Sequence, residues 1–183
     1  QTHALEGAVR YLKGATSHGV KCKWWKVNGI EVYSDSEWRD PSSTCGGVLY
    51  AWGKPVKWWT RKQKTVAMST TEAELVGQAE AVRELRACQN FAEEALEKEL
   101  DTKLIYGDNA KAIDMSNGDC TRRRVKHLNL SESLSLHAKE MYGFNFKRIP
   151  SAEMNADILT KAMGGKSAFL YLKKKLGIGE ISD

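Results

Sequence analysis

Residues 104–113 of this 183-residue chain read LIYGDNAKAI, an apolar run that ends at a glycine and an aspartate and leads directly into a helical pattern. The apolar run predicts a strand over Leu104–Tyr106, and the spacing behind it predicts a helix over Ala110–Met115. Asp108 therefore lies where a strand ends and a helix begins. Side chains from distant segments converge at such positions, so this stretch predicts an α/β sheet with a functional edge.

The segments before this stretch predict antiparallel strands and then a long helix. Four strands are expected, over residues 20–24, 30–34, 46–52 and 56–60. The first two flank Asn28-Gly29, a hairpin turn signal. Ser69-Thr70-Thr71 supplies capping hydroxyls for a helix of more than five turns that reaches Leu96.

The segments at the two ends complete the predicted fold. Helices are expected over residues 3–13, 128–141, 154–161 and 167–176, and a last strand over 144–149. The order predicts an α/β fold with a mixed sheet, antiparallel strands first and parallel ones later, and helices on both faces. We expect a connection helix in 1–18, a main domain in 19–163 and a basic C-terminal helix in 164–183 that packs on the same domain.

Composition narrows the class of partner and the compartment. Lys and Arg exceed Asp and Glu by 28 to 23, which gives a net charge of +5 and favours a polyanionic partner. The four cysteines lie singly, as is typical of reduced thiols. No stretch has the length of a membrane span or the pattern of a signal peptide, so we expect an intracellular protein without a membrane partner. Gln1 in place of an initiator Met suggests a piece of a longer polypeptide.

Most of the 23 acidic residues are expected on solvated helix faces, but four stand at element ends. Asp35 and Asp108 come at strand ends, and Glu74 and Asp157 come in the first turns of helices. Two carboxylates about 4 Å apart repel by about 4 kcal/mol at an effective dielectric constant near 20. Four that converged would therefore need bound cations or protons.

Each of these acids also has a simpler interpretation. Asp108 with Asn109 can cap the helix that follows, and Asp157 can merely favour a helix N-terminus. Glu74 follows Thr71 by three residues and Glu72 follows Ser69 by three, so either glutamate can complete a capping box. Residue types and spacing alone leave both interpretations open.

Several ordered blocks of sequence carry a family resemblance across nearly the whole chain. They are Val9–Gly14, Tyr33–Trp38, Ser43–Gly47, Trp58, Arg61–Leu75, Tyr106–Ile113, Val125–Leu128 and Asn155–Lys161. In order and spacing they resemble the ribonuclease H domain of Ty1/copia-type retrotransposon polyproteins. The resemblance implies the RNase H-like fold, an α/β fold whose mixed sheet has five strands, three antiparallel and then parallel ones. The resemblance implies an endonuclease that hydrolyses the RNA strand of RNA/DNA hybrids during reverse transcription, with a reverse transcriptase domain as its covalent neighbour.

The resemblance also implies a catalytic and metal-binding set made of Asp35, Glu74, Asp108 and Asp157. Glu74 is preferred to Glu72 because the apolar residues that follow it match the family pattern. Oxygen ligands favour Mg²⁺, or Mn²⁺ as a substitute, and two ions per site are implied, with Asp35 bridging them.

The chain departs from the family pattern in two places. Glu37 stands where the family usually has an aspartate and is followed by a shortened connection, Arg39–Ser42, and Asn129 and Glu132-Ser133 replace a usual Asp and a Tyr-His pair. Residues 150–155 also contain no histidine, although many cellular ribonucleases H carry one in the loop before the last catalytic helix. The role of the segment after His127 is therefore open, and His127 itself is interpreted as structural.

Polar and basic side chains complete the predicted nucleic-acid surface. Ser36, Gln78 and Asn109 are candidates for contacts with RNA 2′-hydroxyls. Basic candidates for phosphate contacts are Lys54, Lys57, Arg61, Lys62, Lys64, Arg122, Arg123, Arg124 and Lys126. In the pairs Trp24-Trp25 and Trp58-Trp59, strand alternation predicts one ring in the core and one outside. Two alternatives remain, an integrase-like DNA strand transferase and a non-catalytic nucleic-acid-binding remnant of a retroelement.

Overall fold

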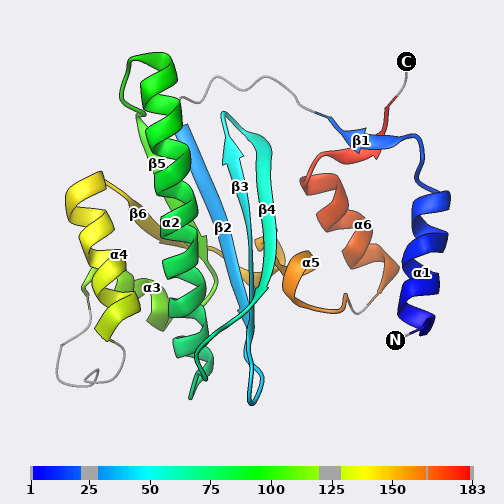
Figure 1. The fold of residues 1–183 in the computed structure, drawn as a ribbon, viewed down its shortest axis with the longest axis horizontal. Helices are drawn as coiled ribbons and strands as arrows, with labels where there is room; N and C mark the ends of the chain where they lie inside the picture. The colour runs from blue at the N-terminus through cyan, green and yellow to red at the C-terminus, as the bar shows by residue number, and fades with distance from the viewer. Residues whose placement is uncertain (1, 22–28, 120–128, 164, 182–183) are drawn as a thin grey trace.

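The computed structural model describes residues 2–21, 29–119, 129–163 and 165–181. At its centre is a five-stranded sheet with the strand order β4-β3-β2-β5-β6 (Figure 1). The strands are β2 Gly29–Glu37, β3 Thr44–Ala51, β4 Lys54–Lys62, β5 Thr102–Gly107 and β6 Asn145–Arg148. The pairs β2–β3 and β3–β4 are antiparallel, whereas β2–β5 and β5–β6 are parallel. The predicted mixed sheet is confirmed.

Three helices cover one face of the sheet: α2 Thr70–Leu96, α3 Ala110–Asn117 and α4 Asn129–Tyr142 (Figure 1). Strand alternation turns Ile30 and Val32 of β2 to this face, where each is at most 1% exposed. They pack in one apolar cluster with Leu85 of α2. The core thus lies between the long helix and the strand that carries Asp35.

The opposite face of the sheet is packed by shorter elements near the C-terminus. A second apolar cluster joins Val48 and Tyr50 of β3 to Leu159 and Leu176. Leu159 lies in α5 Asp157–Thr160, and Leu176 directly follows α6 Lys166–Lys175. Helices therefore lie on both faces, as predicted.

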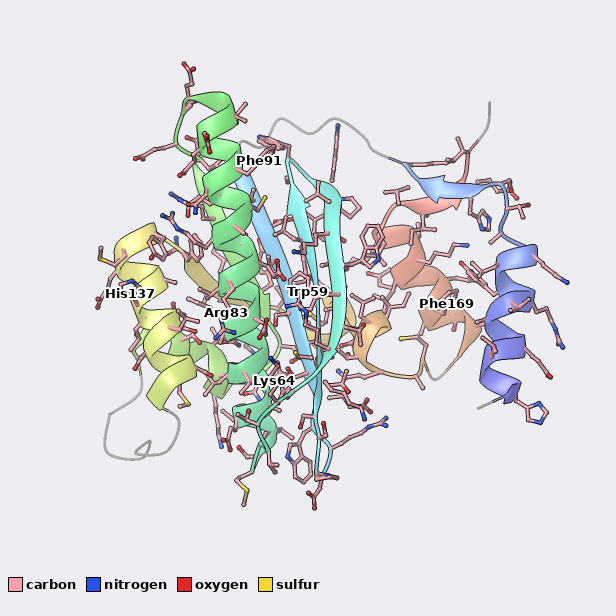
Figure 2. The ribbon with its side chains drawn as sticks, viewed as in Figure 1. Trp59, Lys64, Arg83, Phe91, His137 and Phe169 are labelled. Carbon is pink, nitrogen blue, oxygen red and sulfur yellow. The ribbon has the colours of Figure 1, made fainter. Side chains whose placement is uncertain are left out.

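Strand β4 confirms the expected alternation of its tryptophan pair. Trp59 is 7% exposed and lies in the main core cluster (Figure 2), whereas Trp58 is 59% exposed. Trp24-Trp25 lies outside the described residues.

The predicted hairpin between residues 20–24 and 30–34 is wrong. The strand before the gap, β1 His18–Val20, pairs instead with β7 Ile178–Glu180 near the C-terminus. Both edges of β2 are taken by β3 and β5, and a strand has only two hydrogen-bonding edges. The small β1–β7 sheet lies beside α1 Thr2–Lys13 and α6, away from the main sheet (Figure 1).

The predicted helix over residues 154–161 is shorter than expected. The segment forms a 3₁₀ turn, η2 Ser151–Glu153, and the four-residue α5. Between them, Asn155 donates a side-chain hydrogen bond of 3.1 Å to the Tyr50 hydroxyl, and this contact ties the loop to β3. Lys161 ends the helix with an extended backbone.

No helix in the described ranges combines the length and the apolar character that a membrane span requires.

Candidate active site

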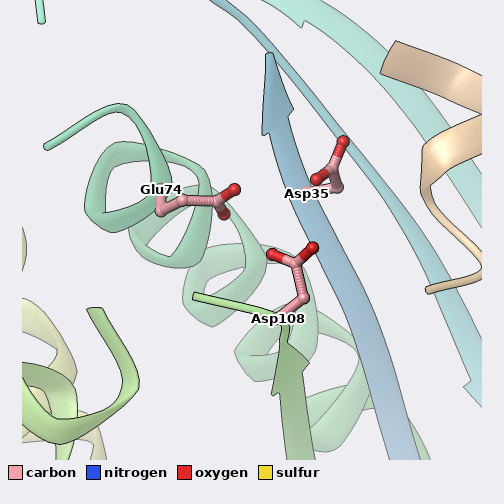
Figure 3. Close-up of side chains that lie close together, drawn as sticks. All are labelled: Asp35, Glu74 and Asp108. Carbon is pink, nitrogen blue, oxygen red and sulfur yellow. The ribbon is translucent and has the colours of Figure 1, made fainter. Parts of the chain in front are cut away.

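Three carboxylates from three elements meet at one end of the sheet. Asp35 comes from β2, Glu74 from the first turns of α2, and Asp108 from the residue after β5, and they point toward one another (Figure 3). Each offers an oxygen, and these oxygens lie within 4.8 Å of one another. We call these three side chains the acid cluster. Their convergence is the arrangement that strand ends and a helix start predicted for them.

The absence of a side chain at Gly77 allows α2 to approach β2 closely. A β-carbon at Gly77 would lie 2.4 Å from the hydroxyl oxygen of Ser36. The close approach lets the Ser36 backbone N–H donate a 3.3 Å hydrogen bond to Oε1 of Glu74. The backbone of the central strand therefore orients the glutamate.

Glu72 and Glu74, the two glutamates between which the sequence left a choice, have different surroundings. The Ser69 side chain accepts a hydrogen bond from the Glu72 backbone N–H, and the Glu72 carboxylate accepts one of 2.7 Å from the Met68 N–H. Glu72 thus contributes to a helix cap. Glu74 is 5% exposed and lies in the acid cluster.

The acid cluster is electrostatically strained in the metal-free protein. Burial, followed by the charges of Asp35 and Asp108, raises the pKa of Glu74 from 4.5 to about 9. Its Oε2 atom is buried and has no hydrogen-bond partner among the described residues. A buried carboxylate with an unpaired oxygen is costly unless a proton or a cation accompanies it.

Asp35 is fully buried and is held by α5 on the side away from Glu74. Thr160 donates a short hydrogen bond from its hydroxyl to Oδ2 of Asp35, and Lys161 Nζ lies 3.0 Å from Oδ1. Gly46 of β3, which pairs with Asp35, makes room for this contact. A β-carbon there would lie 2.8 Å from Cγ2 of Thr160.

Asp157 joins the site through Lys161. The ammonium group lies 2.8 Å from Oδ1 of Asp157 and so bridges Asp157 and Asp35. Burial raises the pKa of Asp157, against the lowering effect of the hydrogen bond from Lys161. Burial alone would lower the pKa of Lys161, but the hydrogen bond to Asp157 and the charge of Asp35 raise it.

Asp108 and its neighbour Asn109 have separate partners. The Ser151 hydroxyl donates a 2.7 Å hydrogen bond to Oδ2 of Asp108, whereas the Asn109 side chain caps α3 by accepting from the Ala112 N–H at 3.1 Å. The structure therefore supports helix capping by Asn109, whereas Asp108 makes no cap contact among the described residues.

Sequence reasoning missed three side chains that contact the acids: Ser151, Thr160 and Lys161. A usable signal existed only for Lys161, which follows Asp157 by four residues, a spacing that places side chains together on a helix.

Two of the polar candidates for RNA contacts lie in the protein interior. Gln78 is fully buried and accepts a 2.6 Å hydrogen bond from Ser116. Ser36 is 7% exposed and lies 3.5 Å from the side-chain nitrogen of Gln63. Both side chains are buried between α2 and its neighbours and are therefore not exposed to a nucleic acid in this structure. Asn109 remains partly exposed beside Asp108.

The basic candidates on and after β4 divide into two groups. Lys57 and Arg61 pair with the carboxylates of Glu80 and Glu84 on α2. Lys62 and Lys64 are exposed and follow Thr60, which is level with Gly46 and Asp35 across the sheet.

Lys54 begins β4, six residues before Thr60 and therefore roughly 20 Å from the level of Asp35. The basic run Arg122–Lys126 and His127 lie outside the described residues. Glu37, the departure from the family aspartate, pairs at 2.8 Å with Arg39 and is not part of the acid cluster.

The acid cluster fits a divalent cation on the chemistry of its donors. All three ligands are carboxylate oxygens, which Mg²⁺ and Mn²⁺ prefer, and the unpaired Oε2 of Glu74 is a donor already in place. A bound cation would also offset the burial and the repulsion from Asp35 and Asp108 that together raise the pKa of Glu74.

Similar structures define the class of protein. The compost-derived LC11-RNase H1 matches with a TM-score of 0.57 at 18% identity, over 73% of this chain and 93% of that one. Its complex with an RNA/DNA hybrid matches with a TM-score of 0.55 at 18% identity, over 71% and 92%. RNase H1 from the archaeon Halobacterium salinarum NRC-1 gives 0.52 at 17% identity, over 72% and 93%. The chain has the ribonuclease H fold.

Sequence relatives make the assignment more particular. The retrovirus-related Pol polyproteins from transposons RE2 and RE1 of Arabidopsis thaliana are 29% and 27% identical over 96% and 97% of this chain. The chain spans 12% of the length of each. No protein-family model matches it. The homologues of this chain are thus Pol polyproteins of Ty1/copia-type retrotransposons, which confirms the resemblance predicted from its sequence.

Proposed function

We propose that this chain is the ribonuclease H domain of a Ty1/copia-type Pol polyprotein and hydrolyses the RNA strand of RNA/DNA hybrids with Mg²⁺, or with Mn²⁺ as a substitute. The observation that carries the proposal is the acid cluster, in which three carboxylates from β2, α2 and the end of β5 converge. Such an arrangement destabilises the metal-free protein and suits a site for cations. The crystal structure of LC11-RNase H1 in complex with an RNA/DNA hybrid supports the substrate class by analogy.

We propose ligands for two ions from the residues present. Asp35, Glu74 and Asp108 would hold one ion, and Asp35 with Asp157 would hold the other. Two bound Mg²⁺ ions supply an activated water and a stabilised leaving oxygen for phosphodiester hydrolysis.

Hydrogen bonds within the chain orient two of these ligands. The Ser36 backbone N–H fixes one oxygen of Glu74, and the Ser151 hydroxyl fixes one oxygen of Asp108. The free oxygens of these two carboxylates are thereby left for a cation.

The nucleic-acid surface proposed from the described residues is smaller than the sequence predicted. Asn109 lies beside Asp108, and Lys62 and Lys64 are exposed near the level of Asp35. These side chains suit contacts with a ribose hydroxyl and with phosphates. Arg122–Lys126 stays a proposed second basic patch on the sequence alone.

The wider context of the domain is also a proposal. This chain matches only 12% of the length of each of its two Pol polyprotein relatives. We therefore propose that it is part of a polyprotein, with a reverse transcriptase domain as its covalent neighbour. Reverse transcription by such an element favours an intracellular location.

The test is a cleavage assay on the purified chain. Labelled RNA/DNA hybrid, double-stranded DNA and double-stranded RNA are each incubated with Mg²⁺, Mn²⁺ or EDTA, beside the variant Asp108→Asn. We expect metal-dependent cleavage of the RNA strand of the hybrid alone, and none with Asp108→Asn.

Other results would contradict the proposal in distinct ways. Strand joining or cutting of double-stranded DNA would indicate a DNA strand transferase. Salt-sensitive binding of the hybrid without cleavage, by the chain alone and when fused to its reverse transcriptase, would indicate a binding module.

A further inference from the structure

Lys161 occupies an unusual position among the acids. Its ammonium group lies 3.0 Å from Oδ1 of Asp35 and 2.8 Å from Oδ1 of Asp157, between two carboxylates that the proposed function assigns to the second cation. In the part of the chain that the structure describes, it is the only Lys or Arg whose ion pair reaches a member of the acid cluster.

The backbone and the neighbouring side chain hold Lys161 at this place. Its N–H donates a 2.9 Å hydrogen bond to the carbonyl oxygen of Asp157 and closes the single turn of α5. Thr160, one residue earlier, donates to the other carboxylate oxygen of Asp35. One dipeptide thus satisfies both oxygens of the buried aspartate.

The formal charges of the site indicate how many divalent ions it can hold while Lys161 stays in place. With all groups ionised, four carboxylates and one ammonium leave three formal negative charges. One divalent ion reduces these to one, whereas a second would give the site a net positive charge while Lys161 stays in place. The ammonium group already occupies Oδ1 of Asp35 and Oδ1 of Asp157, so a second cation held by these two aspartates would compete with it.

We propose, on the basis of the proposed nuclease function, that Lys161 is a positioning residue that holds the place of the second cation in the free protein. The acid cluster then takes one divalent ion, and the second ion binds tightly only when Lys161 leaves the two aspartates. The phosphodiester of a bound hybrid brings a negative charge and acceptor oxygens for the ammonium group. Binding of the second ion is thereby coupled to binding of substrate.

The test counts ions in the absence of nucleic acid. Mn²⁺ is titrated calorimetrically into the whole chain, and dipolar coupling between Mn²⁺ ions is followed by electron paramagnetic resonance. The wild-type chain should bind one ion tightly. Lys161→Met and Lys161→Gln should bind two and show the coupled spectrum, with the second ion bound at least roughly tenfold tighter than in the wild type.

Two further variants separate position from charge. Lys161→Arg keeps the positive charge and should keep the one-ion behaviour. Lys174→Met removes the same charge from an exposed position on α6 and should also bind one ion. Melting curves with EDTA confirm that each variant is folded before the titration.

The outcomes are distinguishable. Equal stoichiometry in the wild type and in both neutral variants would overturn the role of Lys161 and leave the proposed nuclease function standing. A second ion gained equally by Lys174→Met would show that net charge, not position, is responsible, and would also overturn it. Absence of Mn²⁺ binding by the wild type would count against the proposed function itself.

Discussion

Two of the glutamates of helix α2, ten residues apart, are in opposite electrostatic situations. Glu84 accepts hydrogen bonds from Lys57 and Arg61 of β4, and these bonds lower its pKa against the effect of its partial burial. Glu74 is buried among acids, and its pKa is raised. At Glu84 the chain supplies its own cations, whereas no described ion pair supplies one to Glu74 in the acid cluster. This difference is what separates a structural carboxylate from a proposed ligand.

The largest effect should come from Glu74→Gln, because it removes one ligand and one negative charge from the acid cluster. We expect RNA-strand cleavage with Mg²⁺ to fall by at least roughly 10³-fold, the equivalent of about 4 kcal/mol of transition-state stabilisation. The measurement is single-turnover cleavage of a labelled hybrid. Glu72→Gln is the matched control, since Glu72 only caps the helix. Its rate should stay within a few-fold of wild type, and the reverse ranking would show that the wrong glutamate was chosen.

The next effect concerns the stability of the metal-free protein. A folded-state pKa of Glu74 near 9, above the ordinary 4.5, means that the folded protein binds a proton that the unfolded chain releases between these pH values. This contribution to the free energy of unfolding therefore falls as the pH rises from about 4.5 to about 9. Glu74→Gln should flatten the dependence and stabilise the protein by roughly 2 kcal/mol at pH 8.

Urea unfolding with EDTA at pH 5 and pH 8 measures this difference. Glu84→Gln serves as the control, because the pKa of Glu84 is shifted downward. If Glu74→Gln were no more stable than the wild type at pH 8, the carboxylate would not be the strained group that the geometry indicates.

The sequence predicted those features of the fold and of the acid cluster that depend on short stretches of residues. Alternation in β2, the cap at Ser69 and the strand end before Asp108 are short-range signals, and the family resemblance selected Glu74. The β1–β7 pairing could not be predicted, because it joins segments near the two ends of the chain, and a local turn signal at Asn28-Gly29 pointed elsewhere.

The contacts of α5 were out of reach for a similar reason. Thr160 and Lys161 both contact Asp35 across the sheet, and Gly46 on another strand leaves the space that Thr160 needs. Likewise, the polarity of Gln78 suggested a surface role, whereas the tight packing of α2 buries it. Residue type states what a side chain can do, and tertiary packing decides whether it meets a ligand.

A smaller effect is expected at Lys62 and Lys64, the basic residues at and after the end of β4 that we propose contact nucleic acid. Replacing both Lys62 and Lys64 with Met should weaken hybrid binding by about tenfold at moderate salt and lower the salt slope by about two phosphate contacts. Lys57→Met should change affinity little, because Lys57 pairs with Glu84. Filter binding of Asp108→Asn over a series of salt concentrations measures both quantities without turnover. Equal losses in the two variants would assign Lys57 to the nucleic-acid surface.

The smallest effect should follow from breaking the ion pairs that α2 makes with β4. Lys57 and Arg61 are each nearly half exposed, with side-chain exposures of 49% and 45%, so solvent already screens their charges. Glu84→Gln should therefore lower the free energy of unfolding by less than about 1 kcal/mol at neutral pH, and the loss should shrink as NaCl is raised. Urea titrations at two salt concentrations measure it. A loss as large as the gain from Glu74→Gln would mean that α2 does not divide into a balanced region and a strained one, and the contrast between these two glutamates would no longer mark the acid cluster as a site for cations.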